Sequence, residues 1–171
     1  MVVYTVGHSN RTTKDFIELL KRNGVELLVD IRLIPKSRAN PQFGQRRLER
    51  SLGKAGIGYV HEPRMGGRRR PVKDSINAGW RNASFRGYAD HMATREFKDA
   101  LASLLAFARE KTTAIMCAEA VPWRCHRTLV ADALTHKRCK VLHIIGPSTP
   151  RRHKYTTFLK IARGRLTYPP L

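Results

Sequence analysis

The sequence predicts an α/β fold, with a single domain in which helices flank a mostly parallel central sheet in Rossmann-like layering. Short apolar runs alternate with segments of helical periodicity along most of the chain. Strands separated by helices pair in parallel, because a crossover connection returns the chain to the same end of the sheet. At 171 residues, with 42% hydrophobic residues and no internal repeat or clear linker, residues 1–171 are expected to form one domain.

The first third of the chain contains three predicted strands and two predicted helices. The strands cover residues 2–6, 25–32 and 57–63, and the helices cover residues 15–24 and 45–56. Asn10, Thr12 or Thr13 is a candidate cap for the first helix, and Gly24 is its stop signal. The continuous apolar run in residues 25–32 is typical of a strand that is covered on both faces.

The rest of the chain begins with a long irregular segment and then returns to alternation. Residues 64–86 are rich in Gly, Arg and Asn and are expected to form a long functional loop. Helices are predicted over residues 87–111 and 125–137, with Thr94 as a cap inside the first, and strands over residues 112–120 and 139–146.

The charge balance points to a polyanionic partner. The chain has 33 Lys and Arg against 13 Asp and Glu, a formal net charge of +20. Such a field attracts DNA or RNA, while acidic membranes, ribosomes and small phosphorylated substrates are the alternatives. No basic amphipathic helix, apolar run of spanning length or signal peptide stands out, and three cysteines fit a reducing compartment. We therefore expect a cytoplasmic protein that binds nucleic acid without membrane contact; the oligomeric state stays open.

Polar residues follow three of the predicted strands. These residues are His8, Asp30, Arg32, Cys117 and Glu119. The carboxyl ends of neighbouring parallel strands form the usual ligand crevice of open α/β sheets, so we expect the five side chains to converge if their strands are neighbours.

The two carboxylates have structural interpretations as well as functional ones. Asp30 follows apolar residues, so it must be desolvated or paired, and Arg32 is the nearest partner. Glu119 lies between two alanines just past a core strand and needs a partner such as Arg124, Arg127 or a ligand.

The segment Cys125-His126-Arg127 is expected to open a helix. Helix N-termini bind phosphate through exposed amides, Arg127 adds a bidentate donor, and the helix dipole lowers the pKa of Cys125. A buried capping network is the alternative.

Cys117 is either a small core residue or a nucleophile. Zinc ligands drawn from Cys117, Cys125, His126, Cys139 and His143 lack the compact spacing of structural sites, so we predict no metal and no cofactor.

The long loop offers a second set of contacts. Arg68, Arg69 and Arg70 follow two glycines, and Trp80 and Phe85 are interleaved with cations. The aromatics either stack on bases or pack into the core beneath a solvated loop.

Ordered motifs along almost the whole chain resemble the family called domain of unknown function 488. They are TVGHSN, VDIRLIPKSRANPQF, GIGYVHEPRMGGRRRP, FRGYADHM, MCAEAVPWRCHR, VLHI and GRLTYP. The resemblance implies a compact α/β fold and a shared site, and it leaves the activity open. The positions that carry it are His8, Ser9, Asn10, Asp30, Arg32, Arg38, Asn40, Tyr59, Gly66, Gly67, Arg86, Gly87, Tyr88, Cys117, Glu119, Cys125, His126 and Arg127. A weaker similarity to rhodanese-like domains fails at the loop after Cys117.

The leading hypothesis is an enzyme that hydrolyses a glycosidic bond in DNA, as a DNA glycosylase does in base repair. The predicted catalytic residues are Glu119, Asp30 and His8. The predicted nucleic-acid or phosphate contacts are Ser9, Asn10, Arg32, Arg38, Arg68, Arg69, Arg70, Trp80, Arg86, Tyr88, Arg124, His126 and Arg127. The alternatives are a non-catalytic DNA- or RNA-binding module and sulfur or phosphoryl transfer to a small substrate, with Cys117 or Cys125 as the nucleophile.

Overall fold

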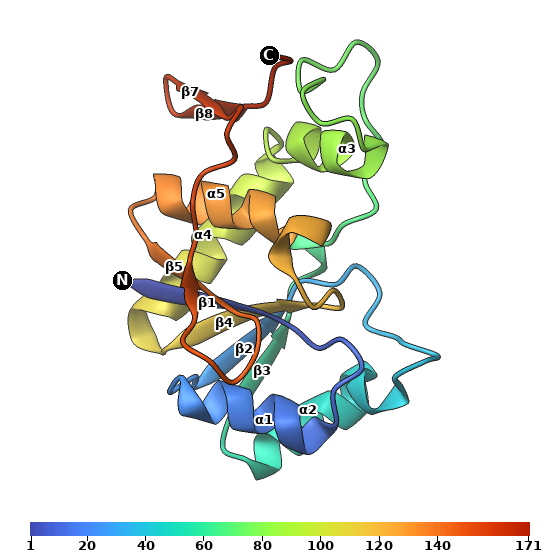
Figure 1. Ribbon diagram of the computed structural model, residues 1–171, viewed down its shortest axis with the longest axis vertical. Coiled ribbons are helices and arrows are strands. Elements are labelled where there is room, and N and C mark those ends of the chain that lie inside the picture. The colour runs from blue at the N-terminus through green and yellow to red at the C-terminus, as the bar shows by residue number, and fades with distance from the viewer.

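A computed structural model describes residues 1–171 and contains a six-stranded sheet (Figure 1). Five strands run parallel, and the sixth runs antiparallel at one edge, in the order β3-β2-β4-β1-β5-β6. They are β1 (Val2–Gly7), β2 (Leu27–Asp30), β3 (Gly58–His61), β4 (Thr113–Cys117), β5 (Lys140–Ile144) and β6 (Arg151–Arg152). The predicted α/β fold with a mostly parallel central sheet is confirmed.

Helices cover both faces of the sheet (Figure 1). Helices α1 (Thr13–Arg22) and α2 (Gln45–Lys54) lie on one face, and α4 (Arg95–Glu110) and α5 (Arg127–His136) lie on the other. Helix α3 (Ala83–His91) and a hairpin of β7 (Lys160–Ala162) and β8 (Arg165–Thr167) lie beyond α4 and α5. Side chains alternate across β4: Ile115 packs into the core below α4 and α5, and Met116 into the core above α1 and α2.

Polar side chains start three of the helices. Thr12 accepts a hydrogen bond from the Asp15 amide at 3.1 Å and is the cap of α1, from among the three candidates. Thr94 accepts from the Phe97 amide at 3.2 Å and caps α4, as predicted. Asn82 caps α3 by accepting from two amides, an arrangement the sequence analysis did not predict.

Several boundaries differ from the predictions. The predicted helix 87–111 is two helices, because Asn82 starts α3 inside the expected loop and Thr94 starts α4 anew. The loop expected over residues 64–86 is therefore irregular only between Met65 and Asn82. The strand predicted over residues 25–32 pairs only from Leu27 to Asp30. The sequence analysis missed β6, β7 and β8, which are two or three residues long and largely exposed, so they lack a hydrophobic pattern.

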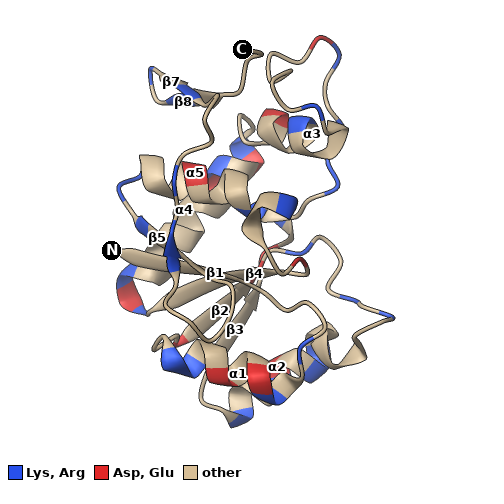
Figure 2. Cartoon of the chain, viewed as in Figure 1, with Lys and Arg blue, Asp and Glu red and all other residues tan.

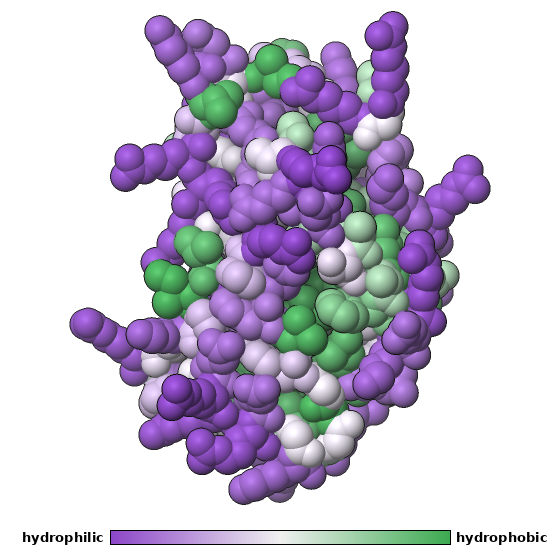
Figure 3. Space-filling view, turned by 180° about the vertical axis from the view of Figure 1, so that it is seen from behind, coloured by the Kyte–Doolittle hydropathy of each residue, from purple (hydrophilic) through white to green (hydrophobic).

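The positive charge is distributed over the whole molecule. Lys and Arg lie on most helices and loops (Figure 2). From behind, long hydrophilic side chains project all around the outline, and hydrophobic residues are exposed in a band between them (Figure 3). Charge alone therefore does not single out one binding face. None of the helices has the length and hydrophobicity that crossing a bilayer requires.

Gly7, at the end of β1, allows the chain after β4 to pass directly over it. A Cβ atom at Gly7 would collide with the backbone carbonyl of Glu119. We expect Gly7→Ala to lower the free energy of unfolding by about 2 kcal/mol or more, as overpacking does when backbone must shift. Urea denaturation measures the effect.

Gly53→Ala is the matched control. Gly53 lies in α2 with no atom within 4 Å of the added methyl group. This change should stabilise the protein by about 0.5–1 kcal/mol through helix propensity. Equal effects of the two substitutions would contradict the close approach at Gly7.

Candidate functional site

The carboxyl ends of β1, β4 and β2 are neighbours, as the prediction required. Of the five residues expected to converge, Arg32, Cys117 and Glu119 line one pocket at this edge of the sheet. His8 and Asp30 are buried and are not part of its lining. The His8 amide donates to the Cys117 carbonyl at 3.0 Å, and the Ile31 amide donates to the Met116 carbonyl at 3.0 Å. These bonds extend the parallel ladders just beyond the strands and join the three segments that follow them.

A pocket of about 420 Å³ opens at this edge of the sheet. Four cationic side chains and a single carboxylate line it, so the pocket favours an anionic ligand. The lining residues are Arg32, Leu33, Ile34, Lys36, Gly67, Arg68, Asn82, Ser84, Phe85, Cys117, Ala118, Glu119, Arg124, Cys125 and His126.

Asp30 is fully buried and fully bonded. Its carboxylate accepts a bidentate pair from the Arg32 guanidinium, at 2.9 Å from Nε and 2.7 Å from Nη2, and a third hydrogen bond from the Arg32 amide at 3.1 Å. The Tyr59 hydroxyl donates a fourth at 2.6 Å. A carboxylate with these partners has no lone pair directed at a ligand. The structure therefore does not support the catalytic role predicted for Asp30, which instead holds Arg32 in place.

Arg32 in turn holds His8. Its Nη1 atom donates to His8 Nε2 at 3.3 Å, and its Nη2 atom also donates to the Phe43 carbonyl at 2.8 Å. His8 donates from Nδ1 to the Ser9 carbonyl at 2.8 Å and stacks on the Phe43 ring at 4.4 Å. Burial lowers the pKa of His8, so the ring is neutral. Because both ring nitrogens are occupied, the structure does not support proton transfer by His8, and Arg32 has little capacity left for phosphate.

The side chain of Glu119 is exposed, and none of the five ion pairs of the protein includes it. The sequence analysis expected a carboxylate that needs a partner, but it is the backbone carbonyl of Glu119 that has one. This carbonyl accepts from Arg127 Nη2 at 2.5 Å. The Glu119 carboxylate is therefore free to meet a ligand or a water molecule.

Arg127 is fully buried at the start of α5, beneath the site. Besides the Glu119 carbonyl it donates to Thr5 Oγ1 at 3.4 Å, and its Nε atom has no partner. Burial lowers the pKa of Arg127 to about 9. The predicted phosphate contact by Arg127 is not supported, because a fully covered guanidinium cannot reach a phosphate.

The two cysteines of the site lie together. The sulfur atoms of Cys117 and Cys125 are in direct contact, and His126 Nδ1 lies 3.6 Å from the sulfur of Cys125. Burial lowers the pKa of His126 to about 4, so this ring is neutral. Gly67 packs closely on the imidazole, because a Cβ there would lie 2.9 Å from Nδ1.

The family model described as "Domain of unknown function DUF488" matches residues 12–134. The chain belongs to the DUF488 family. The matched segment contains the Asp30–Arg32 pair and the whole stretch from Cys117 to Arg127, while His8, Ser9 and Asn10 precede it. Searches of curated proteins and of solved structures found no match.

Other predicted contacts in this DUF488 chain lie outside the pocket. Tyr88 is fully buried and donates to the Met65 carbonyl at 2.7 Å, so the predicted base contact is not supported. Trp80 packs half-buried against Phe85, Phe158 and Tyr168, which fits the core-packing alternative for this residue. The remaining predicted contacts outside the pocket lining are Ser9, Asn10, Arg38, Arg69, Arg70 and Arg86.

The sequence analysis missed three features of the site. Lys36 lines the pocket, and Trp123, beside Arg124, has 56% of its surface exposed. Asn82 and Ser84 enter the lining because α3 starts within the expected loop. A sequence signal for Trp123 did exist: it lies between a proline and an arginine, in a segment that is not apolar. Its exposure is notable because large aromatic side chains are mostly buried.

A chain of buried hydrogen bonds runs from the site to the C-terminal segment. The Thr5 hydroxyl donates to His143 Nδ1 at 2.7 Å, His143 Nε2 lies 2.9 Å from His153 Nδ1, and His153 Nε2 donates to the Asp132 carboxylate at 2.8 Å. Asp132 also accepts from the Tyr168 hydroxyl at 2.9 Å. No group of three or more His, Cys, Asp and Glu side chains is arranged to hold a metal ion.

The buried histidines make the stability of the protein depend on pH. Burial, His153 and Arg127 lower the pKa of His143 from 6.5 to about 3, and burial also lowers the pKa values of three further histidines, His8, His91 and His126. Below about pH 6.5 the unfolded chain binds protons that the folded protein excludes, so the free energy of unfolding should fall as the pH decreases.

Urea denaturation at pH 7.5, 6.5 and 5 checks this prediction. The variant His143→Gln keeps a neutral donor and acceptor at the site and should show a shallower decrease. A free energy of unfolding that is unchanged or higher at pH 5 would contradict the lowered pKa values of the buried histidines.

Removing the charge of Asp30 tests the role of its ion pair. Asp30→Asn leaves the Arg32 guanidinium buried without a counter-charge, so we expect a loss of about 3–5 kcal/mol in the free energy of unfolding. Tyr59→Phe removes only one hydrogen bond from the same carboxylate and should cost about 1 kcal/mol. Similar losses of unfolding free energy in the two variants would show that the Asp30–Arg32 ion pair does not stabilise the fold.

Proposed function

We propose that the protein is a nucleic-acid-acting hydrolase that cleaves a glycosidic bond in DNA, with Glu119 as the catalytic carboxylate. The observation that carries the proposal is the exposed and unpaired Glu119 side chain, in a pocket whose other charged side chains are all cations. Hydrolysis of an N-glycosidic bond needs a carboxylate that activates water or stabilises positive charge on the sugar.

The size and charge of the pocket fit a nucleotide that is turned out of the duplex. The volume of about 420 Å³ lies within the roughly 300–1,000 Å³ typical of small-molecule sites. Lys36, Arg68 and Arg124 are exposed at its rim and are placed to neutralise flanking phosphates. The exposed indole of Trp123 is available to stack on a base or to fill the gap that an extruded base leaves.

A second candidate, thiol chemistry on a small anionic substrate, rests on the contact between Cys117 and Cys125. Both cysteines line the same pocket, and His126 lies beside Cys125. A nucleophilic thiol here would have a second thiol within reach to resolve a covalent sulfur intermediate. His126 Nδ1 lies within hydrogen-bonding distance of the Cys125 sulfur, at 3.6 Å.

The test of function uses labelled duplexes that carry damaged or modified bases, incubated with the protein and then treated with alkali. We expect strand breaks at one modified base with the wild-type protein. Glu119→Gln should lower the cleavage rate by about 100-fold or more, because the group that activates water is lost. Its affinity for the same duplex, measured across salt concentrations, should stay within about twofold of the wild type.

Matched variants separate the alternatives in the same assay. Glu110→Gln removes a carboxylate from the far end of α4 and should leave cleavage unchanged. Cys117→Ser and Cys125→Ser should both keep cleaving, and loss of activity in either one would favour the thiol candidate. Salt-sensitive binding without any product across the panel would contradict hydrolysis and leave a binding module.

A further inference from the structure

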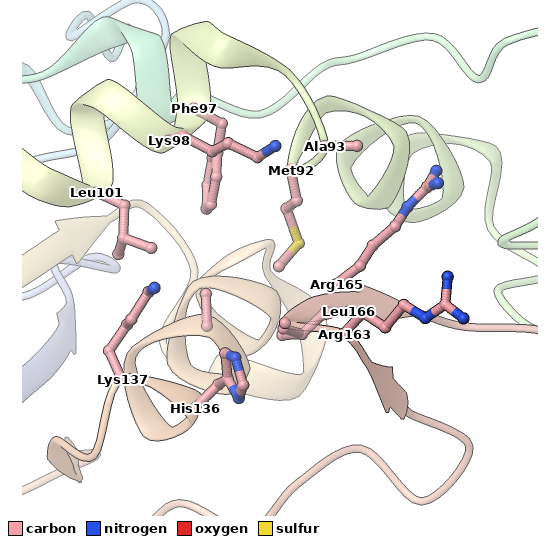
Figure 4. A pocket seen from close by; sticks show the side chains of 12 residues that line it. Met92, Ala93, Phe97, Lys98, Leu101, His136, Lys137, Arg163, Arg165 and Leu166 are labelled. Atoms are coloured by element: carbon pink, nitrogen blue, oxygen red, sulfur yellow. The ribbon is translucent and has the colours of Figure 1, made fainter.

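A second cavity lies at the opposite side of the helical layer from the sheet, between α4, α5 and the β7–β8 hairpin (Figure 4). Its volume is about 400 Å³, again in the range of small-molecule sites of roughly 300–1,000 Å³. Its lining shares no residue with the pocket at the strand ends. The residues are Met92, Ala93, Phe97, Lys98, Leu101, Ala133, His136, Lys137, Arg163, Gly164, Arg165 and Leu166.

Half of this lining is hydrophobic. Met92, Phe97 and Leu101 point into the space from the α3–α4 side, and Leu166 faces it from the hairpin (Figure 4). These side chains belong to or pack against the larger hydrophobic core, so the floor of the cavity is a continuation of that core. A floor of this kind favours the aliphatic or aromatic carbon of a ligand.

All of the ionisable side chains in the lining are basic. Lys98, in α4, and Lys137, just after the end of α5, both line the cavity (Figure 4). His136, Arg163 and Arg165 complete the set, and none of the five ion pairs of the protein includes any of these residues. Unpaired cations around an apolar floor, with no carboxylate among them, are complementary to an anion that has an apolar body.

The hairpin gives this cavity its third wall. Its turn is tight, with positive φ at Arg163 (49°) and Gly164 (76°), and the turn places both of its arginines beside the opening. Its strands are three residues long and largely exposed, and a two-stranded ribbon of this length is only marginally stable by itself. A ligand between the hairpin and the helices would add the contacts that the hairpin lacks.

We propose that this cavity binds a small amphiphilic anion, with its hydrocarbon body on the Met92, Phe97 and Leu101 floor and its carboxylate or phosphate group between Lys98 and Lys137. The site is separate from the strand-end pocket and does not depend on the hydrolase activity proposed above. Both parts of the ligand contribute, so neither the headgroup nor the hydrocarbon alone binds as well as the two together.

Isothermal titration calorimetry with simple probes tests this proposal on the full chain. Octanoate and octyl phosphate carry both parts of the ligand, 1-octanol carries only the body, and acetate and inorganic phosphate carry only the headgroup. We expect saturable binding of octanoate or octyl phosphate, about tenfold tighter than that of the one-part probes. Whichever of the two binds more tightly identifies the headgroup. No saturable binding of either, or equal affinity for 1-octanol, would overturn the proposal.

Variants locate the binding. Lys98→Glu combined with Lys137→Glu should weaken binding of the anionic probe about tenfold or more and leave 1-octanol unchanged. Lys14→Glu combined with Lys21→Glu makes the same change in net charge on α1, across the sheet, and should have less than about a twofold effect. Ala93→Trp, at an exposed position, should block all probes by filling the cavity. Equal effects of the two charge reversals would overturn the proposal.

Discussion

The geometry of the candidate site depends on the hydrogen bond from the buried Arg127 guanidinium to the Glu119 backbone carbonyl. The carbonyl can reach that position only because Gly7 has no side chain in its path. The bond fixes the loop after β4 to the start of α5, and a second bond from Arg127 ties both to Thr5 in β1. The Glu119 side chain is exposed, while its backbone is held in place by the buried Arg127.

The two buried arginines of this region are stabilised in different ways. Arg32 has a bidentate carboxylate partner in Asp30, so its charge is compensated directly. Arg127 has carbonyl and hydroxyl partners, and the hydrogen-bond chain beyond Thr5 leads to Asp132 deep in α5. Burying a charge with only neutral partners is costly. Both arginines thus stabilise the framework of the site, and the Glu119 carboxylate has no ion-pair partner.

Hydrophobic periodicity predicted the sheet, the helices on both faces and the meeting of three strand ends, since these follow from local pattern and from the topology of parallel sheets. The role of each polar residue did not follow in the same way. Asp30 and Glu119 are both carboxylates just past a core strand, yet one is fully bonded and the other is free. That difference is set by tertiary neighbours such as Tyr59. Tyr88 was predicted to contact nucleic acid, but it packs against the core and is fully buried.

The antiparallel strand β6 has a consequence for how copies of this protein meet. An unpaired edge strand offers backbone groups to which another chain can add, and proteins protect such edges with short strands and charges. Here the edge beside β5 is occupied by two residues, Arg151 and Arg152, and both are exposed. A second molecule approaching this edge would meet two guanidinium groups that repel its own and a ladder too short to extend. The same residues that close the sheet thus act against edge-to-edge aggregation.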